Sequence, residues 1–272
     1  YDLKISSKYL KTLGSMGEPL AASVAKWFSK SFNLRNKAIV NTYYQTENGG
    51  ILFSPTFKED SSTFGTVGKS FCNKINLNIK KNSNKKEDLK VQTPWPGCMI
   101  NVENEKTIWE KYWDKNNFFN LFDVGRYDKK NRLLILGRND DVINIRGHRI
   151  GTSEIESIIL QIDEVIEACA VPVADKLEGH RICIFLVCKK GNKNNIQDRI
   201  NSKLIENFGT FAIPKKTYFV SSLPKTRSGK IIRRVIRDII ENKSEKRNLG
   251  DLSTLLDKKS VLEIIKLSKK DD

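Results

Sequence analysis

The second half of the chain alternates between helix-like and strand-like spacing of apolar residues, and this pattern restricts the fold more than any other feature. Apolar residues at helical spacing occur over 153–162, 196–208 and 231–240. Runs rich in β-branched residues fall between them, at 165–171, 181–188 and 216–220. The order predicts α-β-β-α-β-α, which is a small α+β domain.

Two local signals predict where helices of this domain begin. Ser153 is followed three residues later by Glu156, which is the spacing of a capping box. The loop 223–230 carries Pro and Gly and ends in Lys230, which is expected to open the third helix. An anion at such a position would meet both the ammonium group and the positive end of the helix. An ordinary basic turn is the alternative.

The first half has an α/β character. A helix is expected over 21–32, and strands over 38–44 and 132–136. The strand at 38–44 runs into the polar segment 45–50, and strand ends of this kind are where α/β folds bind ligands. Charge-rich residues at 241–272 are expected to form a terminal helix or two.

The formal net charge of +16 allows an anionic partner such as nucleic acid. Much of the excess lies in Lys- and Asn-rich stretches, 80–86 and 189–195, which carry no aromatic residue for base stacking. These read as solvated loops, so neither a nucleic-acid nor a membrane partner is expected. The five cysteines include no C-x-x-C pair and no signal peptide is visible, so a cytoplasmic location is expected.

Three further segments carry side chains suited to nucleotide chemistry. Residues 14–19 form a glycine-bracketed turn, which also occurs without any ligand. Residues 41–50 place a carboxylate beside a Thr hydroxyl, a pairing that can hold Mg²⁺ on a nucleotide phosphate, and a plain polar loop is the alternative. Asp123 can accept hydrogen bonds from two ribose hydroxyls, and Arg138 and Arg149 can bind phosphate in a forked geometry, although surface Arg–Asp pairs are equally common.

Together, the order and spacing of the four segments resemble the adenylate-forming superfamily and, within it, the acetyl-CoA synthetase family. The resemblance covers residues 9–240. It implies the end of a large N-terminal adenylation domain at 1–140, a small mobile C-terminal domain at 141–240 and a charged tail at 241–272. The fold class expected is therefore α/β followed by α+β.

The resemblance implies an AMP-forming acetate–CoA ligase that uses ATP, Mg²⁺ and CoA. The family's phosphate-gripping loop is not found in this sequence, so a partial chain that is inactive alone is expected. A propionate or other short-chain ligase is the alternative substrate class. A non-catalytic remnant of a split gene is the alternative to an enzyme.

Site residues follow from the resemblance position by position. Lys230 is the expected catalytic residue and Glu47 the Mg²⁺ ligand, with Asp140 at the hinge, Gly147 facing CoA and Tyr44 in the acyl pocket. The resemblance also implies an acetyltransferase and a deacetylase that act on Lys230 as partners. Acetylation would remove the positive charge of this residue. The expected nucleotide-binding residues are Gly17, Glu18, Pro19, Asn41, Thr42, Tyr43, Tyr44, Gln45, Thr46, Asp123, Arg138 and Arg149.

Several positions depart from the family pattern. Tyr44 replaces a usual Trp but is still bulky, so a short acyl chain is expected. Asn41 stands in place of Asp, Phe122 in place of Gly, and Arg146 in place of a frequent Ser. Ile205 stands near the expected CoA-contacting Arg.

Overall fold

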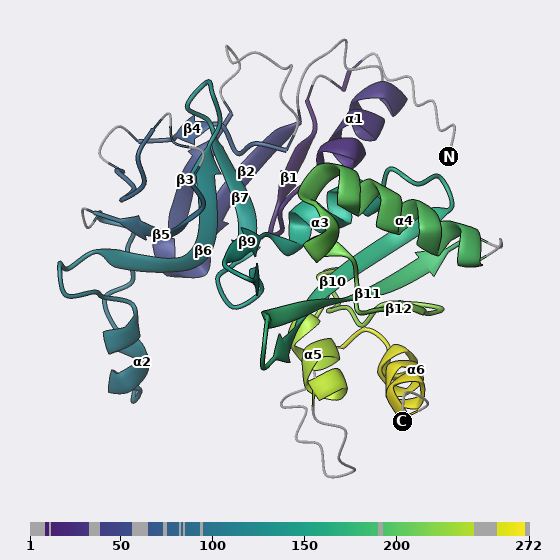
Figure 1. Ribbon diagram of the computed structural model, residues 1–272. Coiled ribbons are helices and arrows are strands. Elements are labelled where there is room, and N and C mark those ends of the chain that lie inside the picture. The colour runs from purple at the N-terminus through teal and green to yellow at the C-terminus, as the bar shows by residue number, and fades with distance from the viewer. Residues whose placement is uncertain are drawn as a thin grey trace. The chain divides into compact units, whose positions relative to one another are not determined.

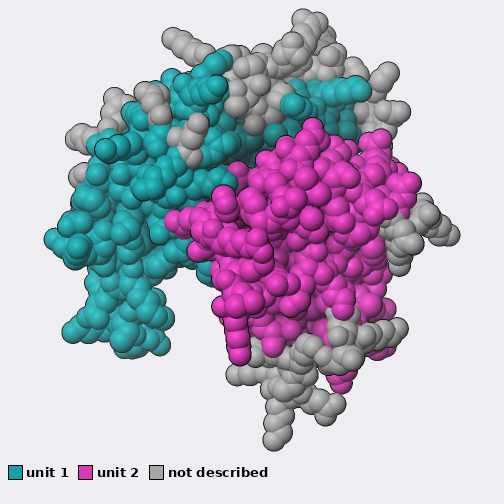
Figure 2. Space-filling view, in the orientation of Figure 1, with its two compact units in different colours: residues 1–140 teal, residues 141–272 magenta. Residues whose placement is uncertain are grey.

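The computed structural model describes residues 9–10, 12–32, 39–55, 65–72, 75–81, 83, 85–92, 95–189, 193–241 and 255–269. The chain forms two compact units, residues 1–140 and 141–272 (Figure 2). Among the described residues, no helix has the length and apolar character needed to span a bilayer.

The first unit contains two small sheets (Figure 1). One has the order β1 (Gly14–Met16), β2 (Val40–Gln45), β3 (Gly50–Ser54) and β4 (Lys69–Ser70), with β1 and β2 parallel and the other pairs antiparallel. The other is antiparallel and contains β5 (Glu87–Val91), β6 (Phe119–Tyr127) and β7 (Leu133–Arg138). Two helices, α1 (Ala22–Ser31) and α2 (Lys106–Lys111), and the 3₁₀ turn η1 (Thr46–Asn48) complete the described part.

A single apolar core joins residues from both sheets of the first unit. Leu52 and Phe53 from β3, Leu89 from β5, and Phe119 and Leu121 from β6 are all almost fully buried in it. The predicted helix at 21–32 and strand at 132–136 are confirmed within two residues. The strand predicted at 38–44 begins at Val40, and Ala38 lies outside the described residues.

The second unit follows the predicted α-β-β-α-β-α order, which is confirmed. Its elements are α3 (Thr152–Ile159), β10 (Val165–Asp175), β11 (Gly179–Cys188), α4 (Lys193–Phe208), β12 (Lys216–Phe219) and α5 (Arg233–Glu241). The sequence pattern missed the short hairpin β8 (Ile143–Ile145) and β9 (His148–Ile150) that precedes them. The terminal helix expected within 241–272 is confirmed as α6 (Lys258–Lys269).

The long strands β10 and β11 are buried on both faces. Along β10, Ala168 and Ala170 belong to the core beneath α3 and α4, while Cys169 and Val171 belong to the core beneath α5 and α6. This alternation follows from the two-residue period of a strand. Helices therefore cover the sheet on both sides, α3 and α4 on one and α5 and α6 on the other (Figure 1).

The capping box predicted for Ser153 and Glu156 is wrong. Helix α3 begins at Thr152, and Glu154 accepts a hydrogen bond from the backbone N–H of Gly151 at 2.9 Å. The same i, i+3 pattern therefore occurs two residues earlier, with Gly at the cap. Glu156 is only 8% exposed, so its side chain is not a capping group.

Glu156 instead forms the main ion pair of the second unit. Its Oε1 accepts a hydrogen bond from the backbone N–H of Ala170 at 2.9 Å, and its Oε2 lies 2.8 Å from Nη2 of Arg233. Arg233 is the first residue of α5, on the opposite face of the sheet from α3. The pair therefore joins the two helical layers at the β10 edge, and a buried carboxylate of this kind requires its cation.

Replacing Arg233 with Ala should lower the free energy of unfolding of the second unit by about 3 kcal/mol, because Glu156 then remains buried without its cation. The neighbouring Arg234 is exposed, and its replacement by Ala should cost less than about 0.5 kcal/mol. Urea unfolding followed by circular dichroism measures both. Equal losses in the two variants would show that the pair does not hold the layers together.

Candidate functional site

A buried carboxylate, Asp123 on β6, is the centre of the polar groups in the first unit. It is 6% exposed, and its Oδ2 accepts hydrogen bonds from the Tyr43 hydroxyl and from Nε2 of Gln45, both at 2.6 Å. Tyr43 and Gln45 are two residues apart on β2 and so lie on one face of that strand. Two neutral donors thus fix the orientation of Asp123 and leave its negative charge in place.

The hydroxyl of Tyr43 acts as a hydrogen-bond donor to Asp123. Burial raises the pKa of Tyr43 well above its usual 10.0, and the adjacent Asp123 carboxylate raises this pKa further. Tyr43 therefore keeps its proton throughout the neutral range and holds Asp123 as a permanent donor.

Arg138, at the end of β7, is the cation nearest to this carboxylate in the cross-strand ladder. Asp123 and Arg138 are register partners, and Arg138 Nη1 lies 3.9 Å from Oδ1 of Asp123. The same nitrogen donates to the carbonyl of Leu121 at 3.3 Å, and Nε lies 3.9 Å from Asp140. Its side chain is about half exposed, so the guanidinium can meet a ligand from solution.

Glu47 sits on η1, and the backbone around it is closely packed. Gly49 adopts a φ of +62°, and a Cβ there would lie 2.2 Å from the carbonyl oxygen of Gly97, so no other residue fits this approach. The backbone N–H of Met99 donates to the Glu47 carbonyl, and Trp95 Nε1 donates to that of Asn48, both at 2.9 Å. The position of Glu47 is therefore fixed by the 95–99 segment.

Tyr112 was not predicted as a site residue, but its hydroxyl donates to Glu47 Oε1 at 3.2 Å. Tyr112 follows the short helix α2 and lies in none of the four segments, so no sequence pattern marks it. Burial, followed by the Glu47 charge, raises the pKa of Tyr112, and this keeps the hydroxyl protonated as a donor.

Glu47 alone suits a metal ion that brings most of its own ligands. The described residues contain no group of three or more His, Cys, Asp or Glu side chains that could hold a metal. Mg²⁺ bound to a nucleotide needs only one or two carboxylates, because phosphate oxygens and water supply the rest. The donor set is therefore compatible with Mg²⁺ that arrives on a nucleotide.

In the second unit, Lys230 lies on a tight turn instead of opening a helix. The backbone N–H of Thr226 donates to the Lys230 carbonyl at 2.8 Å, and Gly229 has a φ of +89°. Helix α5 begins three residues later, at Arg233, so the prediction that Lys230 opens this helix is wrong. Lys230 is exposed, and its ammonium group is presented by the turn alone.

The hairpin of β8 and β9 carries the other predicted residues of this unit. Arg146 and Gly147 form its turn with φ values of +50° and +84°, a conformation that favours Gly. Gly147 is exposed, and a Cβ on it would meet no atom within 4 Å. Arg149 is half-buried on β9.

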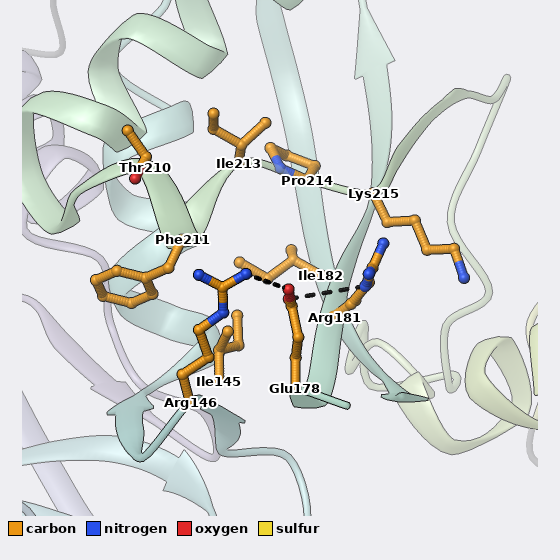
Figure 3. Close-up of a pocket in the computed structure, with 10 residues that line it drawn as sticks. All are labelled: Ile145, Arg146, Glu178, Arg181, Ile182, Thr210, Phe211, Ile213, Pro214 and Lys215. Carbon is orange, nitrogen blue, oxygen red and sulfur yellow. Dashed lines mark hydrogen bonds and ion pairs between the residues drawn. The ribbon is translucent and has the colours of Figure 1, made fainter. Parts of the chain in front are cut away.

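A pocket of about 330 Å³ lies next to this hairpin, within the second unit (Figure 3). Arg146 and Arg181 both form ion pairs with Glu178, which stands between them in the pocket (Figure 3). Lys215 adds a third cation, and Arg181 also pairs with Asp175. Apolar and hydroxyl groups complete the lining, namely Ile145, Ile182, Thr210, Phe211, Ile213 and Pro214.

The remaining predicted residues vary in exposure. Asn41 is buried and its amide donates to the carbonyl of Thr66 at 3.3 Å, which is a core contact. Tyr44 is 41% exposed. Thr42 is half-buried with its Oγ1 3.4 Å from the Ser54 hydroxyl. Exposed or half-buried positions are also found for Gly17, Glu18, Pro19, Thr46 and Asp140.

Comparison with known families and sequences identifies relatives over most of the chain. Residues 154–230 match the AMP-binding enzyme C-terminal domain. Acetyl-coenzyme A synthetase from Emericella nidulans is 34% identical, over 95% of this chain and 40% of the relative. Acetyl-coenzyme A synthetase 1 from Saccharomyces cerevisiae is 36% identical, over 92% of this chain and 37% of the relative. The chain thus spans about two-fifths of the length of these two relatives.

Solved structures of adenylate-forming enzymes share the fold. ATP-bound MatB from Rhodopseudomonas palustris superposes with a TM-score of 0.72 at 21% identity, over 85% of this chain and 46% of that chain. The anthranilate CoA ligase AuaEII in complex with anthranoyl-AMP gives a TM-score of 0.74 at 18% identity, over 86% of this chain and 45% of that chain.

The raised pKa of Tyr43 predicts a loss of stability at alkaline pH. The folded state keeps a proton that the unfolded state loses above about pH 10, so stability is intact below that pH and falls as pH rises further. Unfolding by urea at pH 9 and pH 11 should show a steeper loss in wild type than in Tyr43→Phe, which has no proton to lose. An equal fall in the free energy of unfolding of the two proteins would show that the Tyr43 hydroxyl does not have a raised pKa.

Proposed function

We propose that the chain belongs to the adenylate-forming AMP-binding enzymes and acts in an AMP-forming acetate–CoA ligase, because it matches their C-terminal domain and is similar to acetyl-coenzyme A synthetases over most of its length. Acetate and ATP would give acetyl-adenylate and pyrophosphate, and the thiol of CoA would then displace AMP. The observation that supports this best is the fixed Asp123 carboxylate with Arg138 and Glu47 in the same unit. A carboxylate can accept hydrogen bonds from ribose hydroxyls, and a cation can bind phosphate. A second carboxylate can hold Mg²⁺.

The nucleotide is held, on this proposal, by groups of the first unit. Asp123 would accept hydrogen bonds from the ribose hydroxyls, because the Tyr43 hydroxyl and the Gln45 amide hold its carboxylate in a fixed orientation. Arg138 would contact the ribose or phosphate through its exposed guanidinium. The turn at Gly17, Glu18 and Pro19 would flank the adenine, and backbone and side chains from Asn41 to Thr46 would line the adenylate.

Glu47 would hold Mg²⁺ on the phosphates, where the ion offsets part of their negative charge. The hydrogen bond from Tyr112 uses Oε1 and fixes the carboxylate, which leaves Oε2 as the oxygen better placed for a metal. Tyr44 would close the acyl pocket around a short acid such as acetate.

Lys230 would stabilise the charge that develops on the carboxylate and α-phosphate oxygens during adenylation, because a placed cation acts most strongly where charge appears in the transition state. Arg149 would also contact the nucleotide, and Asp140 would serve as the hinge. Lys230 is exposed, so an acetyltransferase and a deacetylase could reach it, and acetylation would remove the charge.

CoA would approach the hairpin of Gly147, whose lack of a side chain leaves the space above it open. The adjacent pocket supports CoA as the second substrate, because its three cations suit the phosphates that CoA carries. Arg146 and Arg181 are paired with Glu178, so Lys215 is the cation best able to contribute net charge.

Acetate-dependent exchange of pyrophosphate into ATP tests the proposed first step in the full-length protein. Lys230→Ala should reduce this exchange by at least about 100-fold, since one placed electrostatic group is typically worth this much in catalysis. Thioester formation from preformed acetyl-adenylate should be largely spared. Lys176→Ala, which removes an exposed Lys from the turn after β10, serves as the control. Unchanged exchange in Lys230→Ala would exclude its proposed role.

Reversing the charge of Lys215 at the pocket should change only the KM for CoA. Lys215→Glu is expected to raise the KM for CoA by about threefold to tenfold, the effect of one partly exposed charge–phosphate contact, and to leave the KM for ATP unchanged. Lys259→Glu makes the same charge change at an exposed position of α6 and should alter neither value. Steady-state kinetics, with CoA and ATP varied in turn, measures the two KM values separately. Equal effects of the two variants would argue against CoA at this pocket.

A further inference from the structure

Phe122 has a backbone conformation that bulky residues rarely adopt. Its φ is +53°, in the left-handed region, although it lies in the middle of strand β6. A conformation of this kind costs stability and is retained where the surrounding structure requires it. The Phe122 carbonyl accepts a hydrogen bond from the backbone N–H of Asn139 at 2.9 Å, so β6 is held at this point by the residue that follows β7.

The left-handed conformation explains how the Phe122 ring reaches Arg138. Asp123 and Arg138 are register partners and, in a regular ladder, share one face, while the residue before Asp123 points to the opposite face. Yet the Arg138 guanidinium carbon lies 5.6 Å from the centre of the Phe122 ring, which is cation–π distance. The local departure from strand geometry therefore brings the ring to the side of the cation.

The same ring contacts the group that holds Glu47. Tyr112 packs against Phe122 edge-on, with ring centres 5.0 Å apart and an interplanar angle of 85°. The Tyr112 hydroxyl donates to Glu47. A continuous series of contacts thus runs from the Arg138 cation through two aromatic rings to the Glu47 carboxylate.

We propose that Phe122 is a positioning residue, whose ring holds Arg138 and Tyr112 so that the cation and the Glu47 carboxylate keep a fixed separation for a nucleoside 5′-phosphate. The inference rests on the proposed function for the identity of the ligand. Its structural part, that the ring fixes the guanidinium, does not depend on a ligand.

Nuclear magnetic resonance of the full chain tests the structural part directly. The Arg138 side-chain protons should show a ring-current shift that is present in wild type and Phe122→Tyr and lost in Phe122→Ala. Absence of the shift in wild type would overturn the inference, whatever the protein binds.

Two variants separate the ring from the backbone. Phe122→Ala removes the ring and keeps the unfavourable φ, whereas Phe122→Gly removes the ring and tolerates this φ. The Gly variant should therefore melt at a higher temperature than the Ala variant. Both should bind AMP about fivefold more weakly than wild type, the size of one cation–π contact, because both lack the ring.

Calorimetric titration with AMP completes the test. Phe122→Ala combined with Arg138→Ala should bind AMP no more weakly than Arg138→Ala alone, because Arg138 is the group held by the ring that would contact AMP, whereas Tyr112 acts on the proposed metal ligand Glu47. Phe122→Tyr should bind as wild type does, and Phe71→Ala, at an exposed Phe of the same unit, should change nothing. Wild-type affinity in Phe122→Ala, with weaker binding in Arg138→Ala, would overturn the inference and support the proposed function. Failure of wild type to bind AMP would count against the proposed function, and the ring-current test would still decide about Phe122.

Discussion

The pair of Glu156 and Arg233 is the interaction on which the second unit depends. A carboxylate and a guanidinium removed from water must meet each other, and here they do so at the edge of β10, between helices on opposite faces of the sheet. Lys225 makes a second contact with the same strand, through Glu167 at 2.6 Å. Ion pairs on both sides thus anchor the turn that carries Lys230, and they fix the segment that presents this exposed residue.

The first unit holds its buried carboxylate differently. Asp123 receives neutral donors from Tyr43 and Gln45, whereas Glu156 receives a cation. Neutral donors orient a carboxylate without cancelling its charge, and the guanidinium of Arg138 stays 3.9 Å away. Glu156 is therefore suited to structure, and Asp123 is suited to accept hydrogen bonds from a ligand. The difference lies in the partners, because both side chains are carboxylates with little exposure.

Local periodicity allowed the second unit to be predicted almost element by element, because its strands and helices each bury one clear set of apolar residues. What the pattern could not reveal depends on contacts between distant residues. Glu156 was taken for a capping residue because its true partner, Arg233, is 77 positions away. Tyr112 carries no motif, and its contact with Glu47 spans 65 positions. The left-handed conformation of Phe122 was equally invisible, since Phe is not a residue from which sequence reasoning expects it. The roles given to the predicted site residues stay predictions.

The two faces of the β10–β11 sheet are completed at different points along the chain. The core beneath α3 and α4 draws its buried residues from positions up to Ala212, whereas the opposite core also requires Val261 and Ile264 of α6. During synthesis the first face can close while the chain is still growing. The second face is partly covered by α5 but stays incomplete until α6 has left the ribosome, so on this side the nascent unit exposes apolar surface to aggregation for longer.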